Sequence, residues 1–420
     1  MHIFDIIALL IFFSGLFIFI NSIFLKLPSS IGHMILALIL SLTVLLVGTA
    51  FPSLHLAAHV KEYDFAEILS QFVLSVMLFA GALNVNFRKL RDQLVPVILL
   101  AIFGVLISTF TIGTLVFYLL DFMGIYMNYS GCLVFGALIS STDPIAVTKI
   151  ISRFNLSKKL ETKISGESLL NAGFAVVVAL AIVGIHKRME SMEEIGGMEI
   201  TWILVKDIGG GIILGLIVGW VGHRILHFVD NEHAHIEVLV TLALVLTGSW
   251  LGDLIFVSSK AVAMVSGLFI ANYGAHQIGE EDAVGVYVFK FWRLMEESMA
   301  VMLFVLIGFE MLVIPLRLDY FAAGFFTVNI VLFSRWISVF IPISLLSMKQ
   351  SFDNSTISVL SWGALRGGLP VAVSLSLTDF AGKEIIVTLT YVVVVCSVLY
   401  QGLTANSVMR LYQQRAPKLS

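Results

Sequence analysis

Apolar segments long enough to cross a membrane follow one another along almost the entire chain. A membrane-spanning helix needs about 20 mostly apolar residues. Hydrophobic residues make up 59% of the 420 and charged residues only 13%, and no water-soluble domain can bury that much apolar surface. The two-residue alternation of a membrane-spanning strand is absent. The sequence therefore predicts an all-α polytopic membrane protein in which residues 1–420 form a single membrane domain.

Hydropathy divides the chain into about thirteen segments of sufficient length to span a bilayer. They lie near residues 4–25, 29–50, 64–83, 94–121, 127–151, 165–185, 202–228, 235–256, 259–273, 290–314, 320–347, 355–378 and 385–410. The first segment lacks a basic flank and its apolar stretch is longer than that of a signal peptide, so we expect it to be a retained helix.

Lysine and arginine are unevenly distributed between the two sides of these segments. Loops on the side that holds the C-terminus contain 15 of the 25 basic residues, and the opposite loops contain 6. Because cytoplasmic loops are enriched in Lys and Arg, we expect a cytoplasmic C-terminus and an external N-terminus in a multi-pass protein of the plasma (prokaryotic inner) membrane. The net charge of −3 and the lack of a basic run give no sign of a nucleic-acid partner.

Three ionisable residues within apolar segments are the main candidates for a functional role. They are Asp143, Glu167 and Arg366. A charge in hydrocarbon costs roughly 2.5–3.5 kcal/mol on insertion scales, so such residues are retained when they are paired or functional. This pattern favours ion transport.

Two of the apolar segments contain helix-breaking residues at matching places. If thirteen helices divide into six, a linking seventh and six, the fifth helix of the first group contains Asp143 followed by Pro144. The fifth helix of the last group contains Gly363, Gly367, Gly368 and Pro370. Either break alone is compatible with a kink between packed helices, but matched breaks in two repeats indicate the binding site of a transporter near the middle of the membrane.

Four runs of residues resemble one known family along nearly the whole chain. They are GALISSTDPIAVTKII (136–151), SGESLLN (165–171), FVLIGFE (304–310) and SWGALRGGLPVAVSLSL (361–377). In this order they resemble the NhaP-type sodium/proton antiporters of the cation/proton antiporter superfamily.

The resemblance implies an NhaA-like fold with inverted six-helix repeats and two broken helices that cross. It also implies a core part near residues 94–185 and 320–410, and a dimerisation part near 1–83 and 202–314. The protein is then a homodimer in the lipid bilayer that exchanges Na⁺ or Li⁺ for H⁺ by alternating access and serves pH homeostasis. It is a secondary transporter rather than an enzyme, and no cofactor and no resident metal are expected.

The resemblance also assigns residues to the ion site. Thr142 and Asp143 come from the TDP motif, and Ser168 and Asn171 from the GESLLN motif. Glu167 of the second motif is expected to form a structural ion pair with Arg366. For Asp143 a role in binding protons and a role in capping the broken half-helix both remain open.

One position departs from the family at the centre of this site. The family has an ion-binding aspartate directly after the Asn of GESLLN, where this chain has Ala172. Either the protein is a natural member with altered or lost coupling, or the residue was replaced to hold one state; the intact surrounding motif favours replacement. A milder departure is Ser141, where the family usually has proline.

Exchange depends on competition for one carboxylate. Desolvation brings the pKa of a buried carboxylate toward neutrality, so a proton and a hard cation compete for the same anion. If only the loaded carboxylate crosses the membrane, movement of one ion requires movement of the other. With Ala172 that carboxylate is missing, so we expect the chain to fold but to exchange little sodium. A single aspartate in the family motif suggests electroneutral exchange.

Other functions remain as alternatives. A K⁺/H⁺ antiporter or a cation channel would use a similar site. A membrane-embedded hydrolase is a remote alternative, because Ser168 beside Glu167 offers a nucleophile and a base, but no histidine lies in the nearby segments and the G-x-S-x-G motif is absent.

Several polar residues outside this site have two interpretations. A cluster of histidines could form a metal site or a pH sensor, although solvated loop histidines explain it as well. It comprises His223, His227, His233 and His235. Arg335 is either a helix-end residue that reaches the membrane surface or an additional anchor for the core carboxylates. A glycine-rich stretch in segment 202–228 predicts close helix packing. It comprises Gly209, Gly210, Gly211, Gly215 and Gly219.

Overall fold

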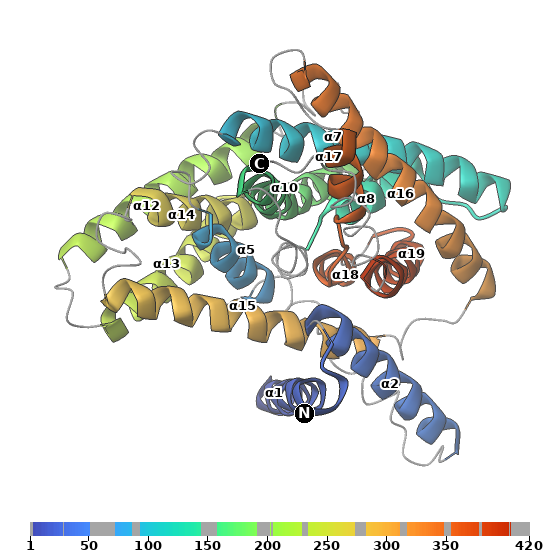
Figure 1. Cartoon of the computed structure of the whole chain (residues 1–420), viewed down its shortest axis with the longest axis horizontal. Helices are drawn as coiled ribbons and strands as arrows, with labels where there is room; N and C mark the ends of the chain where they lie inside the picture. Colours follow the sequence, from blue (N-terminus) through green and yellow to red (C-terminus); the bar gives the residue numbers. More distant parts are fainter. Residues whose placement is uncertain are drawn as a thin grey trace, which may run out of the picture.

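The computed structural model describes most of the apolar segments and contains only helices among the described residues. The described residues are 3–27, 29–50, 72–85, 93–143, 158–190, 202, 205–228, 234–273, 283–310, 317–347, 354–377, 380–402 and 404. Figure 1 shows the helices along the whole chain, and no described residue forms a strand.

The described residues in the first half of the chain form mostly apolar helices. Its helices are α1 (Ile3–Ile20), η1 (Asn21–Leu25), α2 (Ser29–Ala50), α5 (Leu74–Leu83), α7 (Leu94–Phe122), α8 (Tyr129–Ser140) and α10 (Lys158–Glu190). The second half repeats this composition. Its helices are η5 (Val205–Gly209), α12 (Gly210–Phe228), α13 (Ala234–Leu254), α14 (Ser259–Tyr273), α15 (Ala283–Glu310), α16 (Leu318–Ser347), α17 (Asn354–Trp362), α18 (Leu369–Leu375), α19 (Lys383–Cys396) and η7 (Ser397–Gln401).

The predicted class is confirmed, because all regular structure in the described residues is helical. Each predicted segment overlaps at least one of these helices, and seven described stretches are long and apolar enough to cross a membrane. The total of thirteen spans and the inverted repeats stay predictions.

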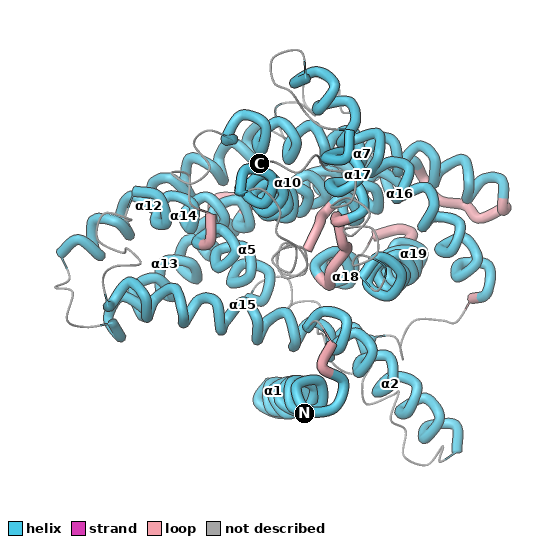
Figure 2. Tube along the Cα trace, in the orientation of Figure 1, coloured by secondary structure: helices cyan, strands magenta, loops and turns pink. Residues whose placement is uncertain are grey.

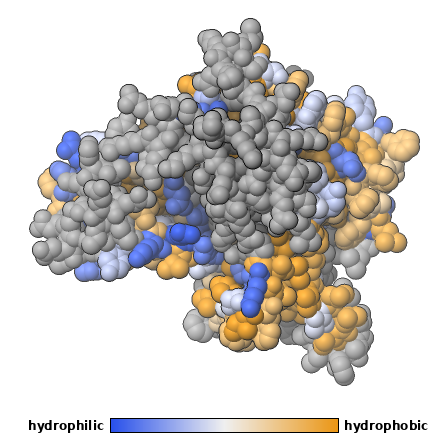
Figure 3. Space-filling view, viewed as in Figure 1, coloured by the Kyte–Doolittle hydropathy of each residue, from blue (hydrophilic) through white to orange (hydrophobic). Residues whose placement is uncertain are grey.

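The surface of the molecule is rich in apolar side chains, as expected for a protein in lipid. Among the coloured residues in Figure 3, hydrophobic side chains form patches at the right and lower parts of the visible face. Phe325 on α16, Ile213 on α12 and Leu239 on α13 are each at least 60% exposed. A water-soluble monomer does not expose apolar patches of this extent.

The helices form two packed groups (Figure 1). In one group α7, α8, α10, α16, α18 and α19 pack against one another. In the other, α5, α12, α13, α14 and α15 pack together, and α1 and α2 join them through α15. Helix α10 also touches α5 and α14, so it lies where the groups meet. The glycines of α12 do allow close packing, since a Cβ on Gly211 would lie 2.8 Å from the carbonyl oxygen of Ser258 beside α14.

Two of the predicted segments contain non-helical residues in the interior of the molecule. Helix α17 ends at Trp362, residues 363–368 are not helical, and α18 starts at Leu369 with Pro370 in its first turn. Helix α8 ends at Ser140 and residues 141–143 are not helical; Pro144 and the rest of that predicted segment lie outside the described residues. Figure 2 shows non-helical segments among the central helices near α17 and α18. The predicted break in segment 355–378 is therefore confirmed, and in segment 127–151 the helix ends at Ser140, just before the predicted break at Asp143 and Pro144.

Candidate ion-binding site

The two interruptions meet in space. The backbone N–H of Asp143 donates a hydrogen bond to the carbonyl oxygen of Leu365, at 2.8 Å. Two residues after Leu365, Gly367 lies against the Asp143 side chain. A Cβ on Gly367 would be 2.5 Å from Oδ2 of Asp143. Only glycine leaves room for this approach. The sequence placed both breaks, but the contact between them comes from the fold.

Arg366 lies at this crossing and binds the end of α8. Its Nη1 donates to the carbonyl oxygens of Ser140 and Ser141, the latter at 2.9 Å, and the side chain is 2% exposed. The last carbonyls of a helix lack intrahelical partners and carry partial negative charge. Arg366 supplies these carbonyl groups with hydrogen-bond donors, and its positive charge balances their partial negative charge.

Glu167 pairs with Arg335, so the predicted pair between Glu167 and Arg366 is wrong. Nη1 and Nη2 of Arg335 donate to the two carboxylate oxygens of Glu167, each at 2.9 Å. Both side chains are buried. Such a bidentate ion pair is stronger and more precisely oriented than a pair with a single hydrogen bond. Arg335 is thus an anchor for a core carboxylate and does not reach the membrane surface, which decides between the two roles left open above.

The hydroxyl groups named by the sequence lie together beside the break in α8. Oγ of Ser168 donates to Oγ1 of Thr142 at 3.0 Å. The Asn171 amide donates to Oε1 of Glu167 at 3.0 Å, and its Oδ1 has no partner among the described residues. Asn171 is 1% exposed, so it faces the protein interior and not the lipid. The structure therefore brings α10 and the non-helical residues after α8 into one polar cluster.

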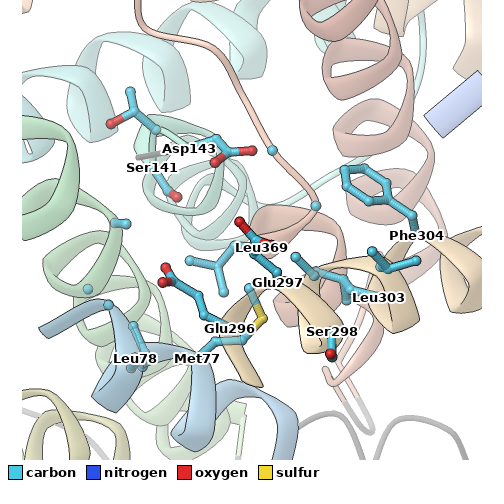
Figure 4. Close-up of a pocket in the computed structure, with 18 of the residues that line it drawn as sticks. Met77, Leu78, Ser141, Asp143, Glu296, Glu297, Ser298, Leu303, Phe304 and Leu369 are labelled. Atoms are coloured by element: carbon cyan, nitrogen blue, oxygen red, sulfur yellow. The ribbon is translucent and has the colours of Figure 1, made fainter. Parts of the chain in front are cut away.

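A cavity of about 370 Å³ lies next to this cluster. Asp143 and Ser141 lie on one side of it, and Glu296 and Glu297 of α15 on the other (Figure 4). Ala172 contributes to the wall, and its methyl group offers no ligand to a cation. The predicted ion-site residues Thr142, Asp143 and Ala172 thus line one cavity, with Ser168 and Asn171 packed behind them.

Two acids of this cavity were missed by the sequence analysis. Glu296 and Glu297 lie near the start of the predicted segment 290–314, where charged residues are common because helix ends reach water. The available signal was an acid followed by a long apolar run, VMLFVLIG. It did not reveal that Glu296 is buried, at 7% exposure.

The histidine cluster is only partly within the described residues. His223 and His227 share a face of α12 with ring centroids 6.4 Å apart, and His235 is exposed on α13. His233 lies outside the described residues. In the part of the chain that the structure describes, no three His, Cys, Asp or Glu side chains are placed to hold a metal.

Two interrupted helices that cross beside buried carboxylates and hydroxyls, in an all-helical membrane fold, define a secondary transporter. The chain belongs to the sodium/hydrogen exchanger family: residues 8–411 match the family described as "Sodium/hydrogen exchanger, transmembrane". The members of this family are transporters and not enzymes.

Individual relatives agree with this assignment. The chain is 39% identical over 414 residues to the Na⁺/H⁺ antiporter NhaP of Pseudomonas aeruginosa, covering 97% of this chain and 96% of that protein. It is 32% identical over 390 residues to the Na⁺/H⁺ antiporter NhaH of Halobacillus aidingensis, covering 92% of each. The solved structure of the sodium proton antiporter MjNhaP1 from Methanocaldococcus jannaschii at pH 8 has a similar fold, with a TM-score of 0.74, 18% identity and 96% coverage of both chains.

Proposed function

We propose that this protein is built as a monovalent cation/proton antiporter that exchanges Na⁺ or Li⁺ for H⁺ by alternating access. The observation that supports this most is the contact between the two interrupted helices at Asp143 and Gly367, beside a cavity. Unwound backbone is tolerated at membrane depth where it lines a cavity that binds ions. The names of the relatives point to the same activity.

The site has most of the oxygen ligands that a sodium ion requires. Hydroxyls of Thr142 and Ser168, the free Oδ1 of Asn171 and the Asp143 carboxylate surround the break in α8. Small hard cations bind such oxygens. What is missing is a carboxylate at position 172, which would project from α10 into the cavity wall. Competition between a proton and a cation for that carboxylate would couple the two fluxes, one for one.

The two packed groups of helices supply the parts needed for alternating access. We assign the group with α7, α8, α10 and α16 to α19 to the ion-carrying core. The group with α1, α2, α5 and α12 to α15 then forms the dimerisation part of a homodimer. In this assignment the ion site is on the core side of the cavity, and α15 of the dimerisation part forms the opposite wall. Sliding of the core past α15 would expose the site to either side of the membrane.

In the orientation that the distribution of Lys and Arg predicts, we place the cavity on the cytoplasmic side. The end of α5, the η1 turn that follows α1 and the start of α2 all contribute to its wall. With the N-terminus outside and the C-terminus in the cytoplasm, each of these helix ends lies in the cytoplasmic half of the membrane. The cavity margin reaches the surface there, since Glu297 is 42% exposed.

The test compares the chain as it stands with Ala172→Asp in proteoliposomes that contain a pH dye. The parent chain is expected to exchange little, and the variant to give alkalinisation that depends on sodium or lithium. The same assay with potassium examines the K⁺/H⁺ alternative. Cation flux without proton movement would identify a channel. If neither variant moved protons with any cation, the proposed function would be wrong.

A further inference from the structure

Glu296 differs from the other acids around the site because it is buried with only a neutral partner. Its Oε2 accepts a hydrogen bond from Nδ2 of Asn84 at 3.0 Å. Among the described residues it forms no ion pair, whereas Glu167 is held by Arg335 at 2.9 Å. A buried carboxylate without a countercharge is neutralised by a proton or by a bound cation, because an isolated charge in a low-dielectric site is costly.

The side chain faces the cavity that the ion site also faces. Figure 4 shows Glu296 across the cavity from Asp143 and Ser141, and the charges of Glu296 and Asp143 are near enough to interact. Oγ of Ser141 is buried at the cavity and has no hydrogen-bond partner in the described part of the chain. This arrangement places a carboxylate and an unsatisfied hydroxyl on facing walls, with room for a cation between them.

Other titratable groups also line the cavity, and Glu296 differs from its neighbour Glu297 in being buried. His33 of α2 and Glu297 of α15 line the same cavity as Asp143. Glu297 is 42% exposed and lies 3.9 Å from Arg293, which is itself 72% exposed. Solvent therefore screens that pair, while Glu296 is not screened in the same way.

We propose that Glu296 is a second cation- and proton-binding carboxylate, which loads and unloads the transported ion next to Asp143. The inference rests on the proposed antiport function and adds a binding step to it. Glu296 belongs to α15, which we assign to the dimerisation part and not to the ion-carrying core, so Glu296 does not carry the ion across the membrane. In the Ala172 chain it binds a monovalent cation and releases a proton, without completing transport.

The direct test measures proton release from purified protein in a weakly buffered solution when NaCl is added. Choline chloride at the same concentration controls for ionic strength. The parent chain is expected to release protons in a saturable, sodium-dependent manner, and Glu296→Gln to lose most of that release. Glu297→Gln is the matched control, because it removes the same charge from the adjacent position and should retain the release.

A conservative variant guards against a folding defect. Glu296→Asp keeps a carboxylate and should retain saturable release at a shifted sodium concentration, with a normal elution profile in detergent. If Glu296→Gln released as many protons as the parent, or if Glu297→Gln lost the release equally, the inference would be overturned.

Transport measurements separate this inference from the proposed function. On the Ala172→Asp background, Glu296→Gln should raise the sodium concentration at half-maximal exchange more than it lowers the maximal rate. If Ala172→Asp exchanges and the added Glu296→Gln changes nothing, the loading role is wrong and antiport stands. If Ala172→Asp does not exchange at all, antiport is wrong, and proton release still decides whether Glu296 binds cations.

Discussion

The two buried arginines near the site have separate structural tasks. Arg335 neutralises Glu167 through both carboxylate oxygens, and Arg366 holds the two carbonyl groups at the end of α8. Because both arginines are buried, Arg335 cannot leave Glu167 without stranding a buried charge, and Arg366 cannot leave α8 without stranding buried carbonyl groups. The pair on α16 and α10 therefore fixes the helix that presents Ser168 and Asn171.

Removing one member of the Glu167 pair is expected to destabilise the protein strongly. Arg335→Leu leaves a buried carboxylate without its cation, a change that costs about 3–5 kcal/mol. Thermal unfolding in detergent measures the loss. The double variant Arg335→Leu with Glu167→Leu should recover part of it, because no unpaired charge remains. Arg317→Leu, at the exposed start of α16, is the control and should leave the unfolding temperature nearly unchanged; an equal drop would contradict the argument.

The crossing of the two interruptions depends on the absence of one methyl group. Gly367→Ala would place a Cβ 2.5 Å from the Asp143 carboxylate, so one of the two segments must move. Overpacking of this kind costs about 1–3 kcal/mol. On the Ala172→Asp background we expect sodium exchange to fall more than the folded fraction does, because Asp143 is displaced. Gly184→Ala on α10, where a Cβ meets nothing within 4 Å, should retain exchange, and a similar loss there would argue against this mechanism.

At the scale of single residues, the sequence identified most of the site but not the ion-pair partner of Glu167. Thr142, Ser168 and Asn171 could be named because they lie in contiguous motifs. The partner of Glu167 could not be, since Arg335 and Arg366 are both intramembrane cations far away in the sequence, and the choice depends on how α16 and the break after α17 pack. Glu296 was missed because burial of a residue near a helix end is a tertiary property.

At the scale of elements, proline and glycine encode where the helices stop. Pro370 in the first turn of α18 is compatible with a helix start, where the missing N–H is not needed. Residues 363–368 include three glycines and form the non-helical stretch before it. These local signals allowed both interruptions to be predicted. Their mutual contact required the packing of α8 against α7, α10 and α19, which no local signal encodes.

The α12 helix is not expected to sense pH for the site. None of the described residues that line the cavity comes from α12, although its His223 and His227 rings are neighbours. Replacing both by Ala on the Ala172→Asp background should leave the pH dependence of exchange unshifted. Glu296→Gln on the same background should change it, and provides the positive comparison. A displaced pH profile in the histidine variant would instead support the regulatory role that the sequence left open.

At the scale of the whole molecule, the cavity lies between the two packed groups of helices. Helix α10 supplies Ala172 and Gly173 to its wall, and α14 supplies Met264. These walls touch directly, because a Cβ on Gly173 would overlap the Met264 sulfur. The site is thus at the boundary between the two groups, where the alternating access proposed above would move one group past the other.

A covalent link across this boundary should stop exchange, and a link within one group should not. Cysteines at Gly173 and Met264, on the Ala172→Asp background with Cys132 and Cys396 replaced, join α10 to α14. Oxidation should abolish sodium-dependent alkalinisation and reduction should restore it, because alternating access requires these helices to separate. Cysteines at Ser130 and His186, whose Oγ and Nδ1 are 2.7 Å apart, join α8 to α10 within the proposed core. Exchange that survives the first link would refute relative motion of the two groups, and exchange lost with the second would show that the core itself must deform.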